Sequence, residues 1–500
     1  MSTTPRTSAA DTGSGEKFDR QLYQLALVVV IGVLMPALDA TVVNVALNTL
    51  STELGASLPA IQWVVTAYLL SLGVVIPLSG WATDRFGAKP VWLVALGGFT
   101  IGSVLCGCAW NVGSLIAFRV VQGLGGGMIM PVGQAALATT AGPKRMGRAM
   151  AFMGIAILLG PALGPIVGGL IVEHVSWRWI FFINPPIGLL AFYLAVRLMP
   201  GTPPIRRAGR LDLPGLVLLS GGLVMLLYGL SKAGSSGGFS GTTVLGCLVG
   251  GAVLLTAFVL YSARRGEASV IDVRLYRNRV FANASVITLL LGMGMYGAML
   301  LVPLYYQVVR GESPLTTGLL VVPMGFGAAV SIPIMGRLID KVGSRLPMLI
   351  GLACFLLGTA AFTQVAPDTS YVWLCVVLFV MGIGLGSSNT PTMVATYSAL
   401  PAETVPRASG VYNVTRQVGG SFGSALFAIL LTRYIDDSFP GTSGEGLHGL
   451  SSIKADRAHV VSVVCDAFQH TFWVAFAFSA VMIIPALLLP NARRPARRGH

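Results

Sequence analysis

Long apolar segments alternate with short polar ones along most of the 500-residue chain. A helix needs about 20 apolar residues to cross the hydrocarbon core of a bilayer, so segments of this length predict membrane-spanning helices. The sequence contains fourteen of them, near residues 24–47, 60–80, 91–109, 112–139, 148–172, 178–198, 214–231, 243–262, 279–308, 316–336, 347–366, 371–396, 407–432 and 470–490. The pattern therefore predicts an all-α polytopic membrane protein, and the even number of segments places both termini on one side of the membrane.

Composition and charge agree with this prediction. Charged side chains make up 10% of the chain and hydrophobic ones 54%, whereas an average soluble chain is about 25% charged. The net charge of +14 would suggest nucleic acid in a soluble protein. Here about 24 of the 33 Lys and Arg lie in the two tails and in the loops after every second segment, the side that the positive-inside rule assigns to the cytoplasm. We therefore expect cytoplasmic termini, location in the plasma membrane, contacts with membrane lipids and no nucleic-acid partner.

The remaining residues do not suggest an enzyme or a cofactor. The six cysteines and five histidines show no metal-ligand spacing, and the sequence has no Walker A motif for ATP. The glycines of residues 292–297 fit a dinucleotide-binding pattern, but they lie inside an apolar segment with no preceding strand. We therefore expect no metal, no cofactor and no catalytic residue.

A ten-residue sequence after the second apolar segment recurs after the tenth. Glycines, an acid and bases occupy the same offsets in the two copies, which contain Gly80, Asp84, Arg85, Gly87 and Lys89, and Gly336, Asp340, Lys341, Gly343 and Arg345. The copies are eight segments apart, whereas two units of six helices would place them six apart. The simplest architecture is two six-helix bundles with two helices inserted between them, and internal repeats of this kind are typical of secondary transporters.

This architecture divides the chain into five parts. They are a cytoplasmic N-tail (1–22), a first six-helix bundle (23–198), a linker with two extra helices (199–278), a second six-helix bundle (279–490) and a basic cytoplasmic tail (491–500). The second bundle includes a long extracytoplasmic loop, 433–469, which ends in a segment that could form an interfacial helix.

Several motifs resemble those of a known family. Residues 80–89 resemble the cytoplasmic loop signature of the major facilitator superfamily. The sequences LDATVVNVAL (38–47), RVVQGLG (119–125), GPALGPIVGG (160–169), WRWIFFIN (177–184) and RQVGGSFG (416–423) are similar to stretches of its fourteen-span drug:proton antiporters, the EmrB/QacA type. The resemblance covers about residues 24–490. It implies the major facilitator fold and proton-driven export.

Asp39 is the one carboxylate that falls well inside an apolar segment, and a charge at that depth indicates a functional site. At 1.5 Å per residue it lies roughly 12 Å from the outer end of its helix, and Arg119 lies roughly 10 Å from the outer end of the fourth. We expect the two to pair, because the family fold places these helices side by side. The pair could couple transport to protons, or it could be a permanent lock between the helices. The third alternative is that the depth estimate is wrong and the two residues do not pair.

Small residues recur at helical spacing in the fifth segment. They are Gly160, Gly164 and Gly168, accompanied by Pro161, Pro165 and Gly169. Such a stripe allows close helix packing, and proline bends a helix. Generic packing is one interpretation, and a gating hinge is the other, favoured mainly by the family resemblance.

The paired loops suggest a cytoplasmic latch. Asp84 could meet the start of the thirteenth segment at Arg407, and Asp340 could meet the start of the fifth at Arg148. The loop residues Gly80, Arg85, Gly87, Lys89 and Lys341 would belong to the same latch. The alternative is that these charges serve membrane topology alone.

A central cavity with few polar groups would suit lipophilic or cationic substrates. Candidate lining residues are Asp39, Gln62, Trp63, Tyr68, Tyr296 and Asn389, and Arg416 could either line the cavity or cap a neighbouring helix. The favoured function is an exporter that exchanges protons for a drug, dye or secreted metabolite. A proton-coupled importer remains open, as does, more remotely, a membrane-embedded transferase; the sequence does not indicate an adaptor protein.

Overall fold

The structure is a computed structural model, and it describes residues 20–201, 210–235, 238–438 and 457–489. The predicted C-tail 491–500 and nearly all of the predicted N-tail 1–22 lie outside the described residues. So do residues 202–209 of the predicted linker and 439–456 of the predicted loop 433–469. The described part is helical throughout, and each of the fourteen predicted segments lies mainly on a helix.

The first half of the chain forms eight helices, five of them long. They are α1 (Arg20–Val45), α2 (Leu47–Glu53), α3 (Leu58–Val75), α4 (Leu78–Phe86), α5 (Ala88–Gly107), α6 (Val112–His174), α7 (Trp179–Phe182) and α8 (Asn184–Leu198). The axes of α3 and α4 differ by 51° at a short break, so this pair is a bent span. Pro77 stands at the break, where it removes a backbone donor.

The fourth and fifth predicted segments are two helices that share the label α6, because a single non-helical residue, Gly142, separates them. The prediction of two segments agrees with this kink, and the connection between them is shorter than expected. Gly142 has φ 62° and ψ 178°, and helical geometry resumes directly after it. Glycine reaches positive φ without a steric penalty, and the following Pro143 disfavours helical ψ at residue 142.

The second half repeats the arrangement after an intervening pair of helices. The pair is α9 (Leu213–Ser235) and α10 (Thr242–Arg265), followed by the short η1 (Gly266–Ala268) and η2 (Val273–Arg277). The second half comprises α11 (Arg279–Leu304), η3 (Tyr305–Val309), α12 (Pro314–Val342), α13 (Arg345–Phe362), α14 (Tyr371–Ser398), η4 (Ala402–Thr404), α15 (Val405–Ser438), α16 (Arg457–Val481) and α17 (Ile483–Leu487). Helix α15 covers the start of the predicted loop 433–469, and α16 covers its end, where the sequence indicated a possible helix.

Twelve of the described helices are long and apolar enough to span a membrane, or thirteen when the bent pair α3 and α4 counts as one more span. Large apolar side chains on their outer faces are exposed, among them Val94, Val253 and Val372. In water this surface would be costly, whereas lipid tails solvate it and the helices satisfy their own backbone hydrogen bonds. The sequence prediction of a helical polytopic membrane protein is confirmed.

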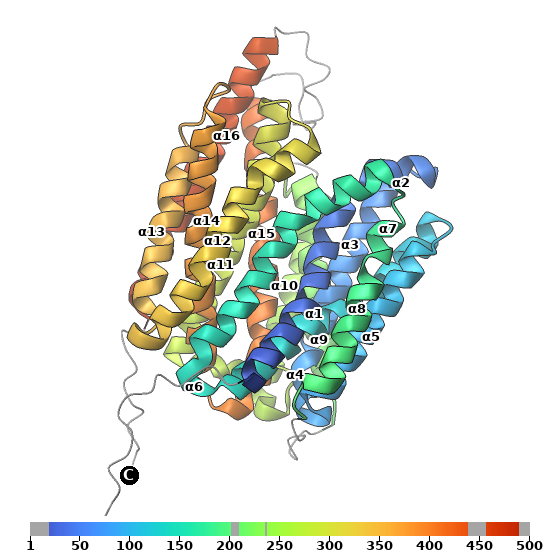
Figure 1. The fold of residues 1–500 in the computed structure, drawn as a ribbon, viewed down its shortest axis with the longest axis vertical. Coiled ribbons are helices and arrows are strands. Elements are labelled where there is room, and N and C mark those ends of the chain that lie inside the picture. Colours follow the sequence, from blue (N-terminus) through green and yellow to red (C-terminus); the bar gives the residue numbers. More distant parts are fainter. Residues whose placement is uncertain (1–19, 202–209, 236–237, 439–456, 490–500) are drawn as a thin grey trace, which may run out of the picture.

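The two halves form bundles that lie side by side, the first in blue to teal and the second in yellow to red (Figure 1). Helix α6 contacts α1, α3 and α5 of its own bundle and α12 and α14 of the other. The inserted α9 packs against α3 and α15, one helix from each bundle, and α10 packs on α9. One such contact is the stacking of Trp63 on Tyr228, with ring centroids 5.5 Å apart.

Candidate functional site

An ion pair between Asp39 and Arg119 lies inside the first bundle. Asp39 is 2% exposed on α1, and Arg119 is fully buried on α6. A guanidinium Nη1 of Arg119 donates to the Asp39 carboxylate. The pairing expected from the similar depths of the two residues is therefore present.

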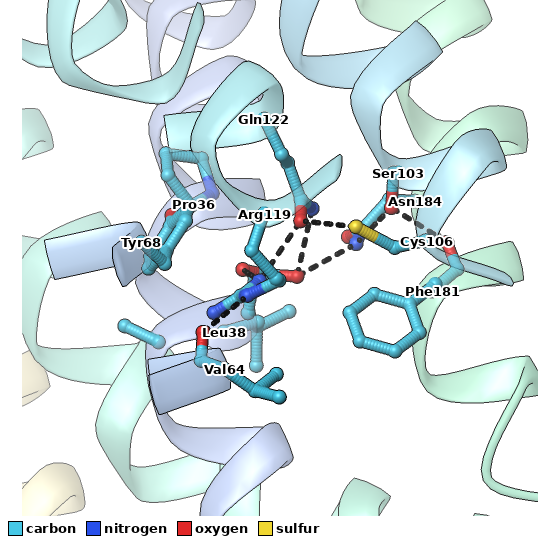
Figure 2. Close-up of polar contacts among 12 residues, drawn as sticks. Pro36, Leu38, Val64, Tyr68, Ser103, Cys106, Arg119, Gln122, Phe181 and Asn184 are labelled. Atoms are coloured by element: carbon cyan, nitrogen blue, oxygen red, sulfur yellow. Dashed lines mark hydrogen bonds and ion pairs between the residues drawn. The ribbon is translucent and has the colours of Figure 1, made fainter. Parts of the chain in front are cut away.

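Three further contacts fix the Arg119 guanidinium in place. Its Nε donates to the Val64 carbonyl at 3.1 Å, and its Nη1 donates to Gln122 Oε1 at 2.8 Å. Its central carbon lies 3.8 Å from the centre of the Tyr68 ring, a cation–π contact. Figure 2 shows Arg119 between Tyr68 on one side and Gln122 on the other. The arginine thus holds α1 and α3 to α6 at one point.

The Asp39 carboxylate also accepts two amide donors. Gln122 Nε2 lies 2.9 Å and Asn184 Nδ2 3.4 Å from Asp39 Oδ1. The Asn184 amide also donates to Ser103 Oγ at 3.0 Å, so the network extends to α5 and α8 (Figure 2). A charge buried away from water requires such partners. Sequence reasoning missed Gln122 and Asn184, although both stand in the motifs it singled out and Gln122 lies one turn from Arg119.

A cavity of about 410 Å³ lies between the two bundles. Its walls come from α1, α3 and α6 of the first half and from α11 and α15 of the second. Most of the lining side chains are apolar, and the polar ones include Thr41, Asn44, Tyr296 and Gln417. Arg416 also lines this cavity, which decides between the two positions expected for it from sequence.

Most of the predicted cavity residues do not line the cavity; of the six, Tyr296 alone does so. Asp39 and Tyr68 are buried in the ion-pair network, Gln62 is exposed and Trp63 packs on α9. Asn389 is buried and accepts a hydrogen bond from Tyr412 Oη at 3.0 Å. Apart from Asn389, which is on α14, the predicted residues lie on helices that form the cavity walls, but the sequence did not determine which face of each helix points inward.

The glycine stripe of the fifth predicted segment packs against α1. A side-chain carbon at Gly160 would lie 2.4 Å from the Ala37 side chain, and one at Gly164 would lie 2.0 Å from Thr41 Oγ1. Gly168 approaches the backbone of Val42 in the same way. The side chains of Pro161 and Pro165 are outside the described part. Gly169 lies apart from this contact, because its nearest neighbour is Leu315 of α12, on the other bundle, at 3.7 Å.

Two ion pairs join the bundles at one end of the molecule. Arg407 Nε of α15 lies 2.9 Å from Asp84 Oδ2 of α4, and Arg148 Nε of α6 lies 3.2 Å from Asp340 Oδ2 of α12. The backbone N–H of Gly147 also donates to Asp340 at 3.0 Å. Both pairs were expected from the repeat, and the structure contains both.

The other residues of the repeat have separate positions. A side-chain carbon at Gly80 would lie 3.0 Å from the Cα of Arg407, so this glycine permits the close approach of α4 to α15. Gly87 has φ 84°, a value that favours glycine at the turn. Lys89 was expected in the latch but instead donates to the Val196 carbonyl at 2.8 Å within the first bundle. Arg85 and Lys341 are exposed.

A buried polar cluster also connects the bundles, and sequence reasoning missed it. Gln134 Oε1 of α6 accepts hydrogen bonds from Tyr397 Oη at 2.9 Å and from Asn413 Nδ2 at 2.7 Å. Asn413 is at the same time a lining residue of the cavity. No charge marks these residues in the sequence, so composition gave no signal for them.

A cavity between two similar bundles of membrane-spanning helices is typical of secondary transporters. A family profile described as Major Facilitator Superfamily matches residues 29–424. The chain belongs to the major facilitator superfamily. Members of this family are multi-pass transporters, typically of the plasma membrane, and they are not enzymes.

Several of its relatives are named as drug-resistance proteins. It is 38% identical to the multidrug resistance protein B homolog of Mycobacterium tuberculosis, over 99% of this chain and 96% of the relative. It is 32% identical to the puromycin resistance protein pur8 of Streptomyces alboniger, over 98% of this chain and 94% of the relative. It is 31% identical to the tetracenomycin C resistance and export protein of Streptomyces glaucescens, over 83% and 77%. The resemblance inferred from the motifs is confirmed.

Solved structures agree on the fold. The proton:xylose symporter XylE matches with a TM-score of 0.60 and 15% identity, covering 93% of this chain and 96% of its own. The human organic anion transporter MFSD10 matches with a TM-score of 0.60 and 15% identity, covering 92% and 100%. At this identity the likeness shows the fold alone.

Removal of both interbundle ion pairs should open the end of the molecule that they close. In the double variant Asp84→Asn with Asp340→Asn, the closed state loses about 1 kcal/mol of stabilisation for each partly exposed pair. The population ratio of open to closed protein should therefore rise about fivefold per pair. Spin labels at the ends of α4 and α15 would report longer distances by electron resonance. Lys341→Gln, which changes an exposed charge on the same helix as Asp340, is the control. An unchanged distance distribution would contradict the latch.

Gly164→Leu should abolish transport while the protein remains inserted in the membrane. Overpacking costs about 1–3 kcal/mol, enough to displace α1 but not to unfold the chain. Transport in cells and the amount of protein in the membrane fraction are measured together. Gly169→Ala is the matched control, because its new methyl group would meet Leu315 at an ordinary 3.7 Å. Full transport by Gly164→Leu would show that the stripe has no functional role.

Proposed function

We propose that this protein is a secondary exporter that exchanges protons for a lipophilic compound by alternating access, with Asp39 as the proton-binding group. The observation that carries the proposal is the burial of Asp39. Among the described residues the buried acids are Asp39, Asp84 and Asp212, and the latter two lie at helix ends. Asp39 is therefore the acid that can hold a proton within the bilayer. The names of the resistance and export proteins related to this chain support export.

In the proposed topology the chain crosses the membrane fourteen times with both termini in the cytoplasm. The two parts of α6 on either side of Gly142 are two of these spans. The bundles correspond to 23–198 and 279–490, with 199–278 between them. In this topology the Asp84–Arg407 and Asp340–Arg148 pairs are cytoplasmic, so the structure represents a state that is closed on the cytoplasmic side.

Coupling in this proposal passes through α1. Protonation of Asp39 would remove its charge and leave Arg119 without a counter-ion, which is unfavourable in a buried site. Arg119 and its neighbours would then hold α1 less firmly. The opposite side of α1 carries Ala37 and Thr41, which contact the glycine stripe and line the cavity. A proton at Asp39 and a substrate in the cavity therefore act on the same helix.

Asp39→Asn should abolish export driven by a pH gradient while energy-independent exchange of substrate continues. The amide cannot bind and release a proton, although it keeps the size of the side chain. Flux is measured in liposomes that contain the purified protein, with a panel of cationic, neutral and anionic dyes. Asp368→Asn makes the same chemical change at an exposed position and should behave as the unmodified protein.

The direction of flux separates the alternatives. Full proton-driven export by the Asp39→Asn protein would remove Asp39 from the mechanism. Dye movement in the same direction as the protons by the unmodified protein would favour an importer. Loss of folded protein in the variant, detected by gel filtration, is distinguished from loss of coupling by the remaining exchange activity.

A further inference from the structure

The cavity carries a single charged side chain. Arg416 is the one charged residue among the side chains that line it, and no Asp or Glu is among them in the described part of the chain. The neighbouring polar groups are neutral, such as Gln417, Ser421 and Tyr296. The cavity therefore has a net positive charge inside largely apolar walls.

The Arg416 guanidinium has one weak acceptor and one buried nitrogen without a partner. Its Nη2 lies 3.4 Å from Met130 Sδ, a weak acceptor. Its Nη1 is buried and has no hydrogen-bond partner. Arg119 of the first bundle also has one buried Nη without a partner, but its other donors bind a carboxylate, an amide oxygen and a backbone carbonyl. A buried donor without a partner is unfavourable, so the cavity is short of one acceptor group.

Close backbone packing fixes the position of Arg416. A side-chain carbon at Gly292 of α11 would lie 2.8 Å from the Arg416 carbonyl oxygen, so only glycine permits this approach. One turn further along α15, the Tyr296 ring packs over Gly420. Arg416 and Tyr296 thus lie on facing helices and both border the cavity.

We propose that Arg416 is the substrate anchor, and that the transported compounds are lipophilic organic anions, such as aromatic carboxylates. This inference rests on the proposed export function and narrows its substrate class. A carboxylate would accept two parallel hydrogen bonds from the guanidinium fork, while the apolar walls would contain the aromatic body. A lipophilic cation would instead face a like charge in a medium of low dielectric constant. The proposal therefore replaces the expectation of cationic substrates.

The test uses three probes that share one ring system and differ in charge: 1-pyreneacetate, its methyl ester and 1-pyrenemethylammonium. Binding to the full-length protein in lipid nanodiscs is measured by equilibrium dialysis, with empty nanodiscs as the blank. We expect the anion to bind at least tenfold more tightly than the cation. Arg416→Gln should weaken binding of the anion at least tenfold and leave binding of the ester within about twofold.

Two further variants separate charge from structure. Arg416→Lys keeps the charge but loses the planar fork, so its affinity for the anion should be intermediate. Arg433→Gln removes an exposed arginine from the same helix and should bind all three probes like the unmodified protein. Tighter binding of the cation by the unmodified protein would overturn the proposal. So would failure of the anion to bind, or equal binding of the anion by the Arg416→Gln protein.

A flux measurement keeps this inference separate from the proposed function. If the anion binds through Arg416 but a pH gradient drives no flux, the site stands and the exporter proposal fails. If a pH gradient drives flux of the cation, and that flux is the same in the Arg416→Gln protein, the exporter proposal stands and the anchor fails.

Discussion

The buried contact between Asp39 and Arg119 constrains the first bundle more than any other interaction. A carboxylate and a guanidinium without water are stable only when each meets further partners, and removal of one partner costs about 3–5 kcal/mol. Here the partners come from α3, α5, α6 and α8, so the geometry of five helices depends on the charge state of one residue of α1. A change in that charge state therefore acts on the packing of α1.

On its opposite side, helix α1 packs closely against α6 with few polar contacts. Glycines at 160, 164 and 168 present a surface without side chains to Ala37 and Thr41, which lets the two backbones approach closely. The contacts between the bundles are different, because they are polar and directional. They are the two ion pairs at one end of the molecule and the Gln134 cluster beside the cavity. A shift of α1 along the stripe would change apolar contacts and one long hydrogen bond, from Thr41 Oγ1 to the Gly160 carbonyl at 3.5 Å, whereas the separation of the bundles requires the polar contacts to break.

Much of this arrangement could be predicted from the sequence. The depth of Asp39 and Arg119 follows from residue counting, and the repeat at Gly80 and Gly336 identifies both interbundle ion pairs. The lining of the cavity could not be predicted. Spans that are apolar on all sides, such as α1 and α11, give no periodic signal of the inward face. Trp63 and Tyr68 are five residues apart on one helix, yet one packs on the inserted α9 and the other under Arg119.

The separation of Asp39, the proposed proton site, from the cavity determines how charge moves in the proposed cycle. Asp39 does not line the cavity, so proton and substrate do not compete for one carboxylate, and the cavity keeps the charge of Arg416 throughout. If one proton enters while one organic anion leaves, two positive charges move inward in each cycle. Each charge that crosses a potential of 100 mV, negative inside, releases about 2.3 kcal/mol. The membrane potential then drives export of an anion twice as strongly as export of a neutral compound, and it does not drive export of a monovalent cation.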